Sequence, residues 1–104
     1  MKYTNSKRGN NIDDLSFEWD DNKEQINIKK HGLNFSVAAR VFLDPDRIEI
    51  YDEVHSITED RYNTIGMVND ILFVVYTERV DSIRIISARV ATKQEMEVYN
   101  YGKY

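Results

Sequence analysis

The spacing of hydrophobic positions changes at Pro45 and divides the chain into a helical part and a strand part. After Pro45, hydrophobic residues alternate with polar ones or gather in short runs, a pattern typical of β-strands. Strands are expected at 48–50, 61–68, 71–78 and 82–89. Because Asn69-Asp70 and Val80-Asp81 make short links between them, we expect hairpin connections and an antiparallel sheet.

The part before Pro45 predicts a short strand and two helices. The strand is Phe17-Glu18-Trp19, and the helix after it is capped by Asp20 and closed by Gly32. A second helix is expected over 37–43, with Ser36 as its N-cap. It should end before Pro45, because proline disfavours helical geometry in the residue that precedes it.

A third helix is predicted after the last strand, where Thr92 and Glu95 have the spacing of a capping box. The expected fold is a single α+β domain over residues 17–104, an antiparallel sheet with two N-terminal helices and one C-terminal helix. Its elements follow the order β-α-α-β-β-β-β-α. Residues 1–16 are polar and lack periodicity, so we expect a mobile N-terminal leader there.

Composition favours one domain outside the membrane. A chain of 104 residues, 41% of them hydrophobic, can form one core but is too short for two ordinary domains. It has no cysteine, so nothing requires an oxidising compartment. Its longest hydrophobic run, Ile71 to Tyr76, is far below the roughly 20 residues that span a bilayer. We therefore expect a cytoplasmic protein with no membrane partner.

Charge is unevenly distributed along the chain. The net charge of −4 argues against a non-specific coat for nucleic acid, which requires an excess of Lys and Arg. Seven carboxylates crowd the middle and are called the acidic flank below: Asp44, Asp46, Glu49, Asp52, Glu53, Glu59 and Asp60. An acidic flank beside a basic sheet suits a basic protein partner as well as a nucleic acid.

Three arginines, Arg79, Arg84 and Arg89, lie in or beside the last two expected strands. Arginine stays charged and presents a planar fork of donors that matches phosphate oxygens. The arginines therefore form either a phosphate-binding surface or a sheet face that simply meets water. Strict alternation puts Arg89 on the face opposite Arg84 unless the strand ends or bulges between them.

The segment 52–61 combines acid–base groups and a cation just before a strand. Histidine is the side chain best suited to proton transfer near neutral pH, so His55 is a candidate general acid or base. Glu59 could orient or replace it, and Arg61 could bind a phosphate. In the alternative interpretation, His55 caps a backbone carbonyl while Glu59 and Arg61 form an ordinary surface ion pair.

Weaker candidates lie elsewhere. Lys30 and His31 either complement the dipole at the end of the first helix or extend a phosphate site toward the sheet. Tyr76 is one of several tyrosines that either stack on bases or belong to a half-buried core. With two histidines, no cysteine and isolated glycines, the sequence predicts neither a metal site nor a nucleotide cofactor.

Eight segments of residues 17 to 99, taken in order, resemble the BrnT family. They are Phe17 to Asp20, Lys30-His31-Gly32, Val41 to Pro45, Asp52 through Ser56, Glu59 with Arg61, Ile65-Gly66, Val75 to Arg79, and Arg84 to Arg89. The resemblance implies a ribonuclease toxin of a type II toxin–antitoxin pair, with a RelE-like fold. Such a toxin cleaves RNA without a metal or other cofactor and inhibits translation.

The resemblance also implies partners and residue roles. The expected partner is a BrnA-like antitoxin with a ribbon-helix-helix domain, which alone contacts DNA and which should cover the arginine surface. The roles would be His55 or Glu59 for proton transfer, Arg61, Arg79 and Arg84 for the phosphate, and Lys30, His31, Tyr76 and Arg89 for substrate binding. The alternative is an antitoxin-binding module with weak or lost catalysis that modulates repression of its own operon.

Overall fold

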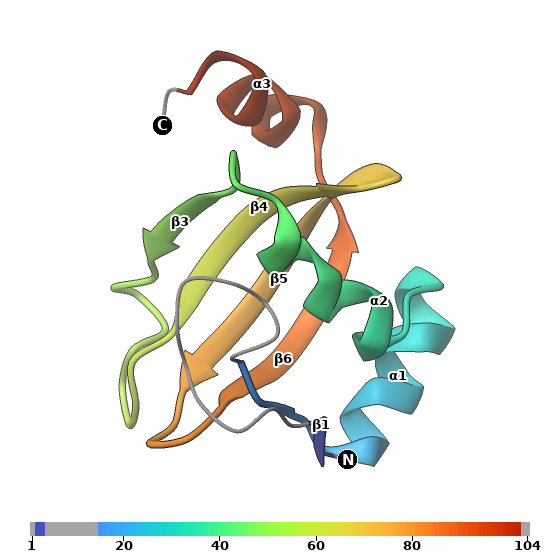
Figure 1. Cartoon of the computed structure of the whole chain (residues 1–104), viewed down its shortest axis with the longest axis vertical. Coiled ribbons are helices and arrows are strands. Elements are labelled where there is room, and N and C mark those ends of the chain that lie inside the picture. Colours follow the sequence, from blue (N-terminus) through green and yellow to red (C-terminus); the bar gives the residue numbers. More distant parts are fainter. Residues whose placement is uncertain (1, 4–14, 103–104) are drawn as a thin grey trace.

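The computed structural model describes residues 2–3 and 15–102 and shows an α+β fold around one mixed sheet (Figure 1). The strands are β1 (Lys2–Tyr3), β2 (Phe17–Glu18), β3 (Ile48–Tyr51), β4 (Tyr62–Val68), β5 (Asp70–Glu78) and β6 (Ile83–Val90). The helices are α1 (Asp21–His31), α2 (Phe35–Ala39), the 3₁₀ helix η2 (Arg40–Leu43) and α3 (Lys93–Tyr101).

The six strands follow the order β1-β2-β6-β5-β4-β3. Strands β3 to β6 form the expected antiparallel meander, and Asn69, at φ 63°, makes the turn between β4 and β5. The expectation of a purely antiparallel sheet is wrong at one place, because β2 pairs with β6 in parallel. Three helices, α1, α2 and η2, lie between β2 and the meander, so β2 is joined to the rest of the sheet by a long connection rather than a hairpin.

The expectation of a mobile leader over residues 1–16 can be compared with the structure at residues 2–3 and 15–16, where the structure differs from it. Lys2–Tyr3 pairs with β2, and the polar composition gave no signal for this strand. Leu15 packs against the core, and the Ser16 carbonyl accepts the N–H of Ile83 over 2.8 Å. The domain therefore includes Leu15 and Ser16, while the expectation for residues 1 and 4–14 lies outside the described residues.

The caps of α1 and α3 are confirmed. Asp20 accepts the N–H of Lys23, Gly32 adopts φ 73°, and Thr92 and Glu95 form the capping box. The predicted start of the second helix is wrong, because Asn34 rather than Ser36 caps it, over 2.8 Å to the N–H of Val37. Asn34 and Ser36 are both good N-cap residues, and the earlier start buries Phe35 completely in the core.

Two faces of the sheet are covered differently. One face, called the helix face below, is covered by α1, α2 and η2. The hydrophobic core between these helices and the sheet includes Phe35, Phe42, Val74 and Ile85. On the opposite face, α3 covers one end, where Met96 packs near Ile65, Ile71 and Phe73. Figure 1 shows α3 at this end and the β3–β4 loop toward the other. This second face carries Arg84 and is called the arginine face below.

A β-bulge in β6 decides which arginines share the arginine face. Tyr76 pairs with Ile85, but Val75 pairs with Ser87, so Ile86 is an extra residue in β6. Beyond the bulge the alternation resumes with its phase shifted by one residue. Arg84 and Arg89 consequently lie on the same face, which simple alternation would not allow.

Candidate active site

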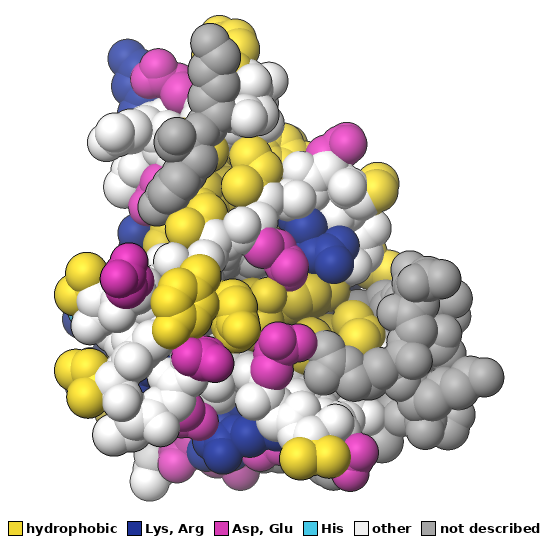
Figure 2. All heavy atoms as spheres, turned by 90° about the vertical axis from the view of Figure 1, so that its left-hand side faces the viewer, with side chains coloured by type: hydrophobic (Ala, Val, Ile, Leu, Met, Phe, Trp, Pro, Cys, Tyr) yellow, Lys and Arg dark blue, Asp and Glu magenta, His cyan; other side chains and the backbone are white. Residues whose placement is uncertain are grey.

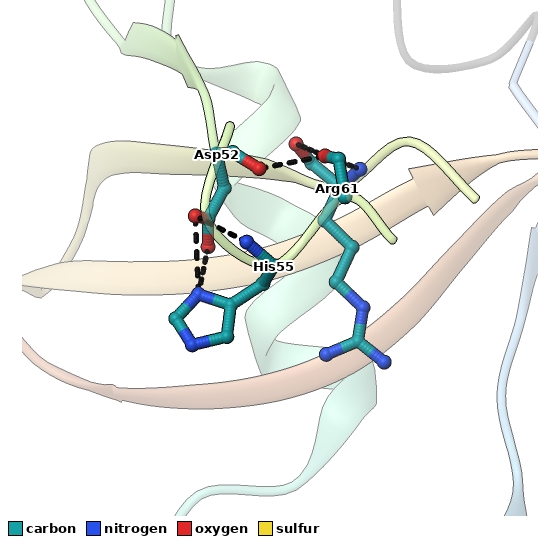
Figure 3. Close-up of polar contacts among 4 residues, drawn as sticks. Asp52, His55 and Arg61 are labelled. Atoms are coloured by element: carbon teal, nitrogen blue, oxygen red, sulfur yellow. Dashed lines mark hydrogen bonds and ion pairs between the residues drawn. The ribbon is translucent and has the colours of Figure 1, made fainter. Parts of the chain in front are cut away.

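His55 is held by Asp52 at the point where β3 leads into the β3–β4 loop (Figure 3). The Nδ1 atom of the His55 ring lies 3.1 Å and 2.9 Å from the two carboxylate oxygens of Asp52. The backbone N–H of His55 donates to the same carboxylate over 3.2 Å. Aspartate commonly accepts such local hydrogen bonds in turns, so the turn itself sets the position of the ring.

Ser56 ties the two ends of this loop together. Its hydroxyl donates to the Asp52 carbonyl over 2.6 Å and accepts the N–H of Arg61 over 2.8 Å. The N–H of Asp52 donates to the Arg61 carbonyl over 2.9 Å. These contacts place His55 and Arg61 on one small frame, and Figure 3 shows both side chains extending from it in the same direction.

The electrostatics of this frame suit proton transfer. Burial opposes ionisation of Asp52, but hydrogen bonds from the His55 ring and N–H outweigh it, so the pKa of Asp52 is lowered. With Nδ1 directed at Asp52, the Nε2 atom of His55 remains for a substrate. The His55 side chain is 65% exposed, so the ring is accessible from solvent.

Arg61 is the cation of this site that has no ion-pair partner among residues 15–102. It directly precedes Tyr62, which packs on the helix face beside Tyr76. Arg61 lies just before β4, but its carbonyl accepts the N–H of Asp52, which continues the β3–β4 pairing by one residue. Because successive residues of paired strands point to opposite faces, Arg61 is directed toward the arginine face. With no carboxylate partner in the described part of the chain, its guanidinium has donors for a phosphate.

Two further arginines carry a carboxylate partner. Arg79 lies 3.4 Å from Glu59, and both side chains are partly exposed. Arg84 donates to Glu18 over 2.7 Å, and Ser82 donates to the other oxygen of Glu18. The Ser82 hydrogen bond and Arg84 together lower the pKa of Glu18 although burial opposes them.

Arg89 shares the face of Arg84 but serves a structural contact. Its guanidinium makes two hydrogen bonds to Glu95 of α3, of 2.8 Å and 2.9 Å, and lies 4.2 Å above the Phe73 ring. These contacts hold α3 against the sheet at the end far from His55. The predicted substrate role of Arg89 thus has no support from its position.

Three other predicted substrate residues are not brought to the arginine face. Lys30 and His31 are exposed at the end of α1, which packs on the helix face of β6 through Asn27 hydrogen bonds to Ala88. Tyr76 is only 4% exposed, and its hydroxyl donates to Glu49 over 2.9 Å on that same face. A buried tyrosine cannot stack on an RNA base without the core opening.

The structure therefore brings the candidates His55 and Arg61 onto one loop frame and places Glu59 of the same loop against Arg79. Arg84 lies on the arginine face of the neighbouring strand β6. Sequence reasoning missed Asp52 as the partner of His55 and assigned that part to Glu59. The Asp-x-x-His spacing in a turn was the available signal, since Asp side chains capture an N–H two or three residues later.

Within the described residues, no group of three or more His, Cys, Asp or Glu side chains is placed to hold a metal ion. No helix in that part of the chain is long and hydrophobic enough to cross a membrane.

Comparison with known proteins decides the family. Residues 19–95 match the family model described as the ribonuclease toxin BrnT of type II toxin–antitoxin systems. The chain belongs to the BrnT family. It is also similar to the crystal structure of the Brucella abortus ribonuclease toxin BrnT, with 30% sequence identity and a TM-score of 0.56. That similarity covers 74% of this chain and 96% of the Brucella chain. No match was found among curated proteins.

Membership of the BrnT family carries two consequences. The family consists of ribonuclease toxins, and a type II toxin is paired with an antitoxin, so this BrnT chain has an antitoxin as its expected partner. The resemblance read from the eight segments is confirmed by the family match and by the fold of the Brucella toxin.

Proposed function

We propose that this BrnT chain is a metal-independent endoribonuclease that cleaves RNA and thereby inhibits translation in the cytoplasm. The observation that carries this proposal is the exposed His55 ring, held through Nδ1 by Asp52 on the frame that also carries Arg61, which has no ion-pair partner among residues 15–102. Acid–base groups next to arginines are what RNA cleavage without a metal requires. The fold is proposed to be RelE-like, as in the wider toxin group that the sequence resembles.

The proposed reaction is an internal transfer of the phosphodiester. The ribose 2′-oxygen attacks the adjacent phosphorus and loses its proton, while the bond from phosphorus to the 5′-oxygen breaks and that oxygen gains a proton. The products are a 2′,3′-cyclic phosphate and a 5′-hydroxyl. We assign a proton-transfer role to His55 through Nε2, because Glu59 is engaged with Arg79.

The arginines are proposed to stabilise the charge that builds up on the phosphoryl oxygens. Arg61 has no competing carboxylate in the described part of the chain. Arg79 is paired only loosely, at 3.4 Å, and can exchange Glu59 for a phosphate. Arg84 is held from one side by Glu18 through Nη1, which leaves its other donors for the substrate.

The proposed neutralising partner is a BrnA-like antitoxin with a ribbon-helix-helix domain. In this proposal the antitoxin alone contacts DNA, and RNA is the substrate of the toxin.

Expression in cells that lack the antitoxin tests this function. The wild-type chain should arrest growth and protein synthesis, and co-expression of its antitoxin should reverse the arrest. His55→Ala should accumulate as folded protein without arresting growth, because the proton-transfer group is lost. Normal growth despite abundant, folded wild-type protein would contradict the proposal.

A second candidate function is an antitoxin-binding module with weak catalysis that modulates repression of its operon. The observation that favours it is the internal pairing of Arg79 with Glu59 and of Arg84 with Glu18, which neutralises much of the predicted phosphate surface. The growth experiment separates the two functions. A binding module would leave growth unchanged and would still alter the affinity of the antitoxin for its operator DNA.

A further inference from the structure

The outer edge of β3 is open within the described residues, since β3 is the last strand of the sheet order. An unpaired edge presents a row of N–H and C=O groups that can accept another extended chain. The strand is short, Ile48–Tyr51, and carries no proline or lysine that would block such pairing. The backbone of this edge is thus suited to pairing with a strand of a binding partner.

Side chains on the two faces of β3 differ in chemistry. Ile48 and Ile50 are half-buried on the arginine face, whereas Glu49 and Tyr51 are exposed on the helix face. A strand added beside β3 would place its own side chains next to these residues on each face. Glu49 lies 3.4 Å from Arg47, yet its side chain is 40% exposed. The best pattern of the added strand is therefore alternation of aliphatic residues, facing Ile48 and Ile50, with basic residues, facing Glu49.

The β3–β4 loop extends this surface. Val54 is 77% exposed and Ile57 is 85% exposed, which is unusual for two large hydrophobic side chains in one short loop. Exposed carboxylates of the acidic flank, among them Glu53 and Asp60, accompany them. Figure 2 looks onto the side of the molecule where Figure 1 shows β3, and it shows hydrophobic side chains gathered there with acidic and basic ones around them.

The negative charge beside the β3 edge favours one kind of binding partner over the others. RNA is disfavoured along the edge of β3 itself, because its phosphates would meet the exposed carboxylates of Glu49 and Glu53 there. A second copy of the chain is disfavoured as well, because pairing β3 with β3 brings identical carboxylates face to face. A basic protein segment has the complementary charge.

We infer that the open edge of β3 and the adjoining β3–β4 loop are the docking site for an extended segment of the antitoxin in which aliphatic residues alternate with Lys or Arg. This inference rests on the proposed function only through the antitoxin partner. The occupant would contact the loop that carries His55, so it would block the candidate site without filling the arginine face. The docking surface thus differs from the arginine surface that the sequence alone suggested.

Hydrogen exchange on the purified complex of the full chain with the antitoxin of its own pair tests the inference. The backbone N–H groups of residues 48–57 should gain the strongest protection on complex formation. Protection confined to residues 79–89 would overturn the inference. Failure of the chain and antitoxin to associate would overturn it too, whereas RNA cleavage by the chain alone is measured separately and bears only on the proposed nuclease.

Measuring the antitoxin affinity of substituted chains is a second test of this docking site. Glu53→Lys should weaken antitoxin binding, and the double substitution Val54→Asp with Ile57→Asp should weaken it by about tenfold or more. Val80→Asp is the control, because Val80 is 92% exposed on the β5–β6 hairpin, outside the proposed surface. Equal antitoxin affinity for all these folded variants would overturn the inference.

Discussion

At the residue scale, Asp52 is the group on which the account of His55 depends. Its carboxylate receives both the ring Nδ1–H and the backbone N–H of His55, which fixes the tautomer and the direction of Nε2. His55 and Arg61 could be named as candidates from the sequence alone, because histidine and arginine side chains have well-defined chemistry. Asp52 was not singled out, since its role depends on the conformation of one turn.

We predict that Asp52→Asn reduces kcat for RNA cleavage by about tenfold or more while leaving KM nearly unchanged, because it misdirects His55 without removing a phosphate ligand. Single-turnover and steady-state kinetics give the two constants. Glu53→Gln is the matched control, since it removes one negative charge from the same loop and the exposed Glu53 is not among the hydrogen-bond partners of His55. Asp52→Asn should add no further loss in a His55→Ala background, and full additivity would refute the positioning role.

At the element scale, the sequence predicted the existence and type of most elements better than their boundaries. The alternation after Pro45 gave β3 to β6, and the capping residues gave α1 and α3, because these signals are local. The parallel pairing of β2 with β6 and the bulge at Ile86 were not predictable. Both depend on contacts between residues far apart in the chain, and the bulge decides the face on which Arg89 lies.

Gly66 of β4 lies where β4 and η2 pack closely against each other. A Cβ atom at Gly66 would lie 2.2 Å from Cγ2 of Val41, so β4 and η2 meet at a distance that only glycine permits. We predict that Gly66→Ala lowers the free energy of unfolding by about 1–3 kcal/mol through overpacking. Urea unfolding of the variant and the wild type measures this difference.

The control for this prediction removes the clashing group. In a Val41→Ala background, Gly66→Ala should cost clearly less than it does in the wild type, because Cγ2 is gone. An equal cost in both backgrounds would mean that the close approach of β4 and η2 is not the cause.

At the scale of the whole molecule, charge is divided between two surfaces with different expected partners. The arginine face, with Arg61 at its edge, has donors for RNA phosphates, and the β3 edge has carboxylates and exposed hydrophobic side chains for a basic segment. The net charge of −4 does not show this division, because a sum over the chain says nothing of where the charged side chains lie. The two surfaces meet at the β3–β4 loop, so antitoxin binding and catalysis would be linked there.

The central claim is that His55 and Arg61 carry out RNA cleavage without a metal. The most direct measurement is cleavage of a long single-stranded RNA by the purified protein in EDTA, with analysis of the 3′ ends. The wild type should produce 2′,3′-cyclic phosphate ends, His55→Ala should be slower by about 100-fold, and Arg61→Ala by about tenfold. Arg40→Ala, which removes an exposed arginine of η2, should cleave like the wild type. No cleavage in EDTA, or wild-type cleavage by His55→Ala, would contradict the claim.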